Sequence, residues 1–339
     1  MGGVLGTDYT MDAATNTLTI LSSTPLTVSG SGELRVVIDG SVSSAKLLLD
    51  GARLKPSGGK DVIAVADGQQ LSLGLKSSSI EAAFATPIRV RSGETLLLTV
   101  EGSSAITGQY SGCFQVDHGG SLVIDGAADN GDENELTVTS KNNAAAIGEG
   151  ATKSGWGDIT IKGATVRAVG SPAGGAGLGG AGGSRSSYED GKSTPVGTIC
   201  IEGGIVHAAG GPGGAGIGAG KNSTTGNKPI ESDGYVTAGC IEIAGGTVYA
   251  EGGSGAAAIG GGQNTDGGDI SITGGVIERA ASVGKTGEGC PVDPSDGVKV
   301  NQVVVSGGVV KPTDGVGKTT LIPMHTLLKD RSMTRRQAR

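Results

Sequence analysis

The sequence predicts an all-β fold, a single-stranded right-handed parallel β-helix of about ten turns with an N-terminal cap. Three observations predict it: short alternating apolar strands recur along the chain, glycine corners connect them, and aromatic residues are scarce. Glycine accounts for 66 of the 339 residues and aromatic residues for only 2 %. The glycine has no collagen-like period, and so few aromatic side chains would not fill an ordinary globular core. A solenoid that buries small residues in a repeating way fits this composition.

The first half of the chain contains the weaker repeats. Their spacing of 24, 25 and 26 residues over the last three steps suits one turn of a three-sided coil with short corners. We divide the chain into an N-terminal cap and first turn (1–40), a parallel β-helix (41–312) and a C-terminal tail or cap (313–339). The apolar triplets of this half begin at Leu18, Leu47, Leu71, Leu96 and Leu122.

The second half carries the stronger repeats, for example "DITIKGATVRAVG" (158–170) and "TICIEGGIVHAAG" (198–210). Each unit is a short alternating strand, a glycine corner and a second strand. Because side chains alternate between the two faces of a strand, the apolar positions of successive turns should stack into inward ladders. We expect one ladder of Ile159, Ile199, Ile241, Ile270 and Val303, and a second of Ile161, Ile201, Ile243, Ile272 and Val305.

The glycine-rich loops "GAGLGG" (175–180) and "GAGIGAG" (214–220) resemble a dinucleotide-binding fingerprint. That fingerprint follows one strand and opens a helix, whereas these loops recur in successive turns and are followed by Gly, Pro and Ser. "GVGKTT" (315–320) resembles the end of a P-loop, but Pro312 stands where that motif needs glycine. We therefore expect no nucleotide and no cofactor, and we assign the glycines to tight corners with positive φ.

The charge and the cysteines exclude several classes of function. The net charge is −7 with scattered acidic residues, which argues against nucleic acid as a partner. No apolar run of about 20 residues occurs, so we expect no membrane insertion. Cys113, Cys200, Cys240 and Cys290 form no C-x-x-C motif. We expect Cys200 and Cys240 to be diagonal neighbours that could form a disulfide only with strain, and the other two to be unpaired.

The opening "GTDYTMDAATNTLTILSSTPLTVSG" and the later glycine-rich units around "GTICIEGGIVHAAGG" resemble a known family. It comprises repetitive cell-surface and secreted proteins of Gram-positive gut-type bacteria, commonly labelled as containing a carbohydrate-binding domain. The resemblance covers about residues 6–312. It implies a right-handed parallel β-helix, an extracellular or cell-surface location and carbohydrate binding. The chain departs from the family in having no L-P-x-T-G sorting motif and an atypical tail after about residue 312.

Four insertions, 151–157, 183–197, 221–239 and 263–268, each lie between a small-residue loop and the next strand. Equal phase in a solenoid places them on one edge of the coil. They contain aromatic and polar side chains of the kinds that bind sugars, unless each ring folds back over its own loop. The candidate ligand-binding residues of this edge are Trp156, Tyr188, Asp190, Asn222, Asp233, Tyr235 and Asp266.

A second candidate site is an outward column on the second strand of each repeat. Alternation places one such residue per turn on the solvent face, about 5 Å from the next. The column either stabilises itself through mixed charges or forms a strip for a polysaccharide or protein partner. Its residues are Arg167, His207, Tyr249, Glu278 and Lys311.

No catalytic or metal-binding residue can be assigned. β-Helix lyases cluster aspartates around calcium and hydrolases pair close acids, but the turns between Asp158 and Asp269 carry Thr198 and Cys240 at the equivalent position. We expect a non-catalytic surface or secreted solenoid, such as a bacterial adhesin, that binds a glycan or a host or cell-surface protein through loops on one edge. The alternatives are a polysaccharide-acting lyase or glycoside hydrolase, and a phage tail or host-recognition module.

Overall fold

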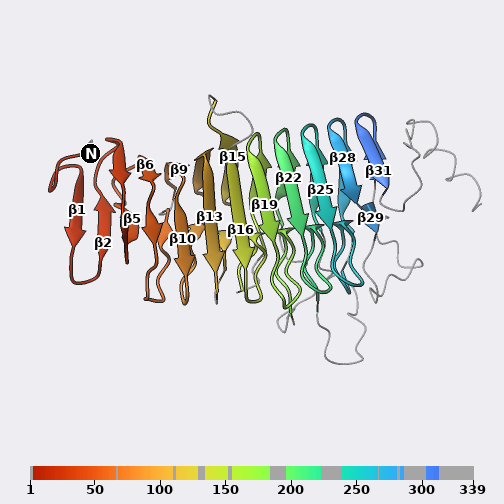
Figure 1. Ribbon diagram of the computed structural model, residues 1–339, viewed down its shortest axis with the longest axis horizontal. Coiled ribbons are helices and arrows are strands. Elements are labelled where there is room, and N and C mark those ends of the chain that lie inside the picture. Colours follow the sequence, from red (N-terminus) through yellow and green to blue (C-terminus); the bar gives the residue numbers. More distant parts are fainter. Residues whose placement is uncertain are drawn as a thin grey trace, which may run out of the picture.

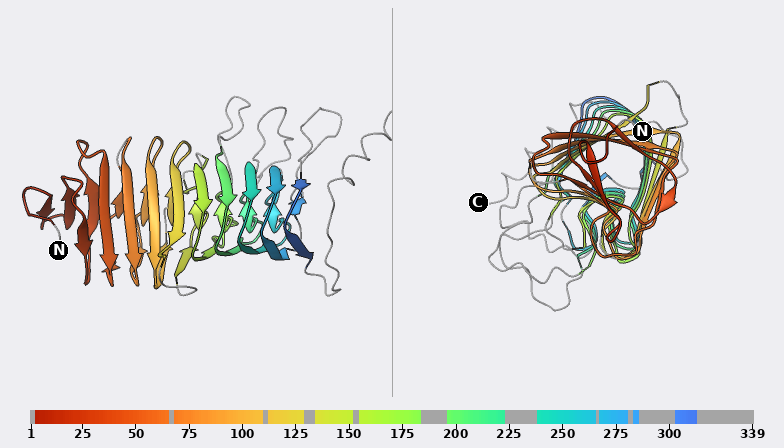
Figure 2. Two further views of the ribbon diagram at one scale, coloured as in Figure 1. Left: turned by 90° about the horizontal axis from the view of Figure 1, so that it is seen from above. Right: turned by 90° about the vertical axis from the view of Figure 1, so that its left-hand side faces the viewer.

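The computed structural model confirms a parallel β-helix. It describes residues 3–65, 68–109, 112–128, 134–151, 155–183, 196–222, 238–265, 267–280, 283–285 and 303–312. Within these ranges every regular element is a β-strand, and the strands wind into an elongated coil with three sheets as its sides (Figure 1; Figure 2).

The chain visits the three sheets, which we call A, B and C, in turn. Sheet A contains β1 (Tyr9–Asp12), β2 (Thr17–Ile20), β5 (Arg35–Ile38), β8 (Ile63–Ala64), β11 (Ile88–Val90), β14 (Phe114–Val116), β17 (Ile147–Gly148), β20 (Leu178–Gly179), β23 (Ile217–Gly218), β26 (Ile259–Gly260) and β29 (Val283–Lys285). Sheet B contains β3 (Leu26–Val28), β6 (Ser44–Asp50), β9 (Gln70–Lys76), β12 (Thr95–Glu101), β15 (Ser121–Gly126), β18 (Asp158–Ile161), β21 (Thr198–Ile201), β24 (Cys240–Ile243), β27 (Asp269–Ile272) and β30 (Val303–Val305). Sheet C contains β4 (Ser31–Gly32), β7 (Arg53–Leu54), β10 (Ser79–Ala82), β13 (Ser103–Gly108), β16 (Glu135–Ser140), β19 (Thr165–Val169), β22 (Ile205–Ala209), β25 (Thr247–Glu251), β28 (Val276–Ala280) and β31 (Val309–Pro312).

Sheet B contains both predicted inward ladders. Its strands pair in parallel and in register from β18 to β30, so each predicted residue faces its counterpart in the next turn. The isoleucines of both ladders are buried. Stacked β-branched side chains pack well on a pleated surface, which explains how the core forms with so few aromatic residues.

The first apolar triplet lies on a different side of the coil from the later ones. Leu18 in β2 pairs with Val36 of β5 in sheet A. In sheet B, Leu96 instead pairs with Leu71 of the preceding turn and with Leu122 of the next turn. All three sides of the coil have inward apolar positions, so a triplet alone does not indicate which side it forms.

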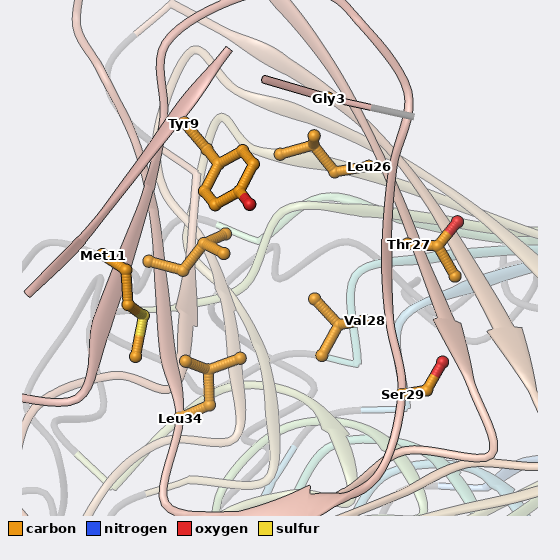
Figure 3. Close-up of a pocket in the computed structure, with 9 residues that line it drawn as sticks. Gly3, Tyr9, Met11, Leu26, Thr27, Val28, Ser29 and Leu34 are labelled. Atoms are coloured by element: carbon orange, nitrogen blue, oxygen red, sulfur yellow. The ribbon is translucent and has the colours of Figure 1, made fainter. Parts of the chain in front are cut away.

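The N-terminal end of the coil begins with a hairpin. β1 pairs antiparallel with β2, whereas sheets B and C begin directly with β3 and β4. Beside the hairpin is an apolar cavity of about 210 Å³, around which Tyr9, Leu26, Val28 and Leu34 point toward one another (Figure 3). The lining residues are Gly3, Tyr9, Met11, Leu18, Leu26, Thr27, Val28, Ser29 and Leu34.

The glycine-rich loops form a column of glycines on sheet A. Gly148, Gly179, Gly218 and Gly260 lie in register on successive strands and have φ values of 129°, 120°, 128° and 133°. A Cβ on any of the first three would collide with the carbonyl oxygen of the glycine in the next turn. These loops therefore have the role predicted for them, positive φ with close contact between backbones.

Candidate functional site

The described ends of the insertions stack on one edge of the coil, as equal phase predicts. Trp156 forms an isolated parallel bridge with Val196, and Gly183 forms one with Asn222. Five of the residues predicted for this edge lie outside the described residues: Tyr188, Asp190, Asp233, Tyr235 and Asp266.

Trp156 does not offer a ring to a ligand, so the prediction of an exposed binding ring at this position is wrong. Its side chain is 0 % exposed and belongs to the hydrophobic core. The residue lies two positions before β18, and its carbonyl oxygen accepts a hydrogen bond from Gly197 N–H at 2.8 Å. This pairing with the next turn fixes the backbone, and the large apolar ring gains more from the coil interior than from water.

Asn222 is also part of the scaffold. The residue is buried, and its carbonyl oxygen accepts a hydrogen bond from the Asn264 Nδ2 amide at 2.7 Å. Its own N–H donates to the carbonyl oxygen of Gln263 at 2.9 Å. A buried residue with these backbone contacts tethers one turn to the next, so the prediction of a ligand contact at Asn222 is wrong as well.

The outward column on sheet C forms as predicted through three of its turns. Arg167, His207 and Tyr249 are direct neighbours on β19, β22 and β25. All three side chains are half-buried. The rings of His207 and Tyr249 stack with their centroids 4.5 Å apart and their planes at 4°.

The column does not continue to Glu278, and that part of the prediction is wrong. The register between β25 and β28 shifts after Val248, so Tyr249 pairs with Arg279. An extra residue in one strand reverses the alternation that follows it. A second shift between β28 and β31 interrupts the column before Lys311.

Arg167 is held by a neighbour in the preceding turn. Its Nε donates to Glu135 Oε2 at 2.9 Å. Glu135 is not among the residues predicted from the sequence, although the alternation of β16 would have placed it on the outer face of sheet C. Partial burial, together with the charge of Arg167, lowers the pKa of His207 and so favours the neutral imidazole.

The described cysteines are free thiols. Cys240 pairs with Thr198, which puts it diagonal to Cys200 as predicted. Cys113 is buried in the core. Burial raises the pKa of the Cys113 thiol to about 12.

We expect Cys113 to resist alkylation in the folded protein. At pH 8 its thiolate should be about a thousandfold rarer than that of an unperturbed cysteine, because burial disfavours the charged form. Peptide mapping by mass spectrometry after iodoacetamide treatment, with and without urea, measures this. Equal labelling of Cys113 in both samples would contradict the buried position.

Among the described residues, no group of three or more His, Cys, Asp or Glu side chains is arranged to hold a metal ion. Asp158, at a predicted acidic position, accepts a hydrogen bond from Thr198 N–H at 2.8 Å and so links two turns. The described ranges also contain no helix long and apolar enough to cross a membrane.

Comparison of the chain with protein-family models, with curated proteins and with solved structures found no match.

Proposed function

We propose that this protein is a non-catalytic binding protein of the cell surface or the secreted space, and that it holds a glycan against the outer face of sheet C. The resemblance of its repeats to Gram-positive surface proteins supports the location. The column of Arg167, His207 and Tyr249 supports the proposal that the ligand is a glycan. We prefer this column to the insertion edge as the binding site, because Trp156 is buried at that edge.

The stacked pair is the observation that carries the proposal. With planes at 4°, His207 and Tyr249 cover each other's faces, and their polar edges are left for a ligand. The imidazole nitrogens and the phenol hydroxyl can both donate and accept hydrogen bonds. Since stacking already fixes the two rings, little rotamer entropy remains to be lost on binding.

The spacing of the column also suits a polysaccharide. Successive strands lie about 4.8 Å apart, comparable with the length of one sugar unit in an extended chain. Hydrogen-bonding groups at this interval can meet the hydroxyls of successive sugars. Outward positions beside the column, such as Ile205, Ala209 and Thr247, have short or aliphatic side chains, which leaves the polar groups accessible.

A panel of neutral glycans tests the proposal. Wild-type protein should bind at least one of them without releasing products. Tyr249→Phe removes only the hydroxyl and keeps the stack, so the affinity should fall about fivefold, as expected for one hydrogen bond. Calorimetry or surface plasmon resonance measures the change.

Tyr9→Phe is the matched control, because Tyr9 lies on β1 at the end of the coil and should leave the affinity unchanged. The proposal is wrong if no glycan binds or if Tyr249→Phe binds as tightly as wild type. New reducing ends or unsaturated products would show an enzyme in place of a binding protein.

A further inference from the structure

Sheet A carries a cluster of arginines on its outer face near the N-terminal end of the coil. Arg35 begins β5, Arg89 lies in β11 and Arg91 follows β11. All three reach Asp61, which precedes β8, the strand between them. Arg35 Nε donates to the Asp61 carbonyl oxygen at 3.0 Å, while Arg89 Nη1 and Arg91 Nη2 lie 3.9 and 3.4 Å from Asp61 Oδ2.

The carboxylates of the cluster are more deeply buried than its guanidinium groups: the side chains of Asp61 and Asp117 are 14 % and 15 % exposed, against 30 % for Arg89 and 40 % for Arg91. The second carboxylate of the cluster, Asp117, accepts a hydrogen bond from Arg89 Nε at 2.9 Å and one from Gln115 Nε2 at 2.6 Å. A third carboxylate, that of the buried Glu94, accepts a hydrogen bond from the Arg91 backbone N–H at 2.6 Å. Three carboxylates thus accompany the three guanidinium groups. The other ion pairs of the described residues each join one cation to one anion: Lys55–Glu81, Lys76–Glu101, Lys162–Glu202 and Arg167–Glu135. Because the carboxylates are the more deeply buried partners, the charges nearest to solvent on this face are those of the guanidinium groups, which favours anions there.

The aspartates hold the guanidinium groups in place and leave most of their donors available. In the described contacts the guanidinium groups of Arg35 and Arg91 each donate one hydrogen bond, and a guanidinium has several more N–H groups. The Arg91 side chain is 40 % exposed, whereas that of Asp61 is only 14 % exposed. The anchoring carboxylate is therefore largely covered, and the free donors face solvent.

We propose that this cluster binds the acidic groups, carboxylate or sulfate, of a polysaccharide. The site lies on a different sheet from the column on sheet C and does not rest on the function proposed for that column. The planar arrangement of guanidinium N–H groups matches the paired oxygens of both anions.

An exposed aromatic side chain in the same corner favours a sugar acid over a small inorganic anion. Phe84 is in the segment that leads into β11 and is 58 % exposed. Its carbonyl oxygen lies 3.8 Å from an ideal Cβ on Gly59, two residues before Asp61. A sugar ring has an apolar face that can pack on such a side chain, and an isolated inorganic anion has none.

Binding of the full chain to polygalacturonate, heparin and uncharged dextran tests the proposal. Wild-type protein should bind polygalacturonate or heparin but not dextran, and the affinity should fall as salt is added. Arg91→Gln and Arg35→Gln should each weaken binding about tenfold, because each removes a charged donor group. Arg53→Gln changes an exposed arginine of sheet C and should have no effect.

The comparison of the two acidic polysaccharides identifies the anion as uronate or sulfate. Failure to bind either, or an equal loss of affinity in Arg53→Gln, would overturn the proposal. Circular dichroism checks that the variants fold, and Arg91→Lys, which keeps the charge but loses the planar group, should fall between wild type and Arg91→Gln. Tyr249→Phe should not alter the binding of acidic polysaccharides, and Arg91→Gln should not alter the binding of neutral glycans. The proposals for the two sites can therefore be contradicted independently of each other.

Discussion

A Gly218→Ala substitution is expected to destabilise the coil by about 2–6 kcal/mol. The residue has a φ of +128°, and strain at a non-glycine residue in such a conformation costs about 1–3 kcal/mol. The new Cβ would also collide with the carbonyl oxygen of Gly260 in the next turn, and overpacking of this kind adds about 1–3 kcal/mol. Urea unfolding followed by circular dichroism measures the shift in midpoint.

Substitutions at two other glycines distinguish the cost of backbone strain from the cost of overpacking. Gly93 has a φ of +78° and no heavy atom within 4 Å of an added Cβ, so Gly93→Ala tests backbone strain alone. Gly40 has the same open space without a positive φ, so Gly40→Ala should be close to neutral. We expect the loss of stability to be largest for Gly218, smaller for Gly93 and smallest for Gly40. Equal midpoints for the Gly218 and Gly40 variants would mean that the turns of the coil are not in close contact at β23.

The coil could be predicted because its signal is periodic. Alternation within "DITI" or "TICI" decides which side chains face inward, and the repeat decides which of them meet in the next turn. Ile201 therefore pairs with Ile161 and Ile243 as expected. The same reasoning located Arg167, His207 and Tyr249 on one outward column.

The prediction failed where the period is broken. β28 and β25 both have five residues. Aligned without a shift, however, Arg279 would take the inward position of the buried Ala250, and this sign of the register shift that moves Glu278 out of the column was overlooked. The arginine cluster was missed for a related reason. Arg35, Asp61 and Arg89 come from different turns and occupy different positions within them, so no repeat alignment brings them together.

Loop composition also did not reveal the direction in which a side chain points. Trp156 stands in an insertion that is rich in polar and small residues, a setting typical of an exposed ring. Its proximity to β18 decides the outcome, because a residue next to a strand of the coil is within reach of the core. Hydrophobic burial then favours the inward orientation.

Trp156→Ala is accordingly expected to lower the free energy of unfolding. Removing a fully buried indole should cost about 3–5 kcal/mol through lost burial and the cavity left behind. The indole Nε1 has no hydrogen-bond partner among the described residues, so Trp156→Phe loses volume but no hydrogen bond seen there. Its cost should therefore be less than half that of Trp156→Ala when both are measured by chemical denaturation.

The binding data then distinguish the two roles of this ring. If Trp156 is part of the core, folded Trp156→Phe should bind glycans as wild type does, while its unfolding midpoint is lower. If the ring were a binding platform, the substitution would weaken binding and leave the midpoint unchanged. Because Trp156 is the only tryptophan of the chain, its fluorescence gives a third readout: emission from a fully buried indole should be blue-shifted in the native wild type and should not move when glycan is added.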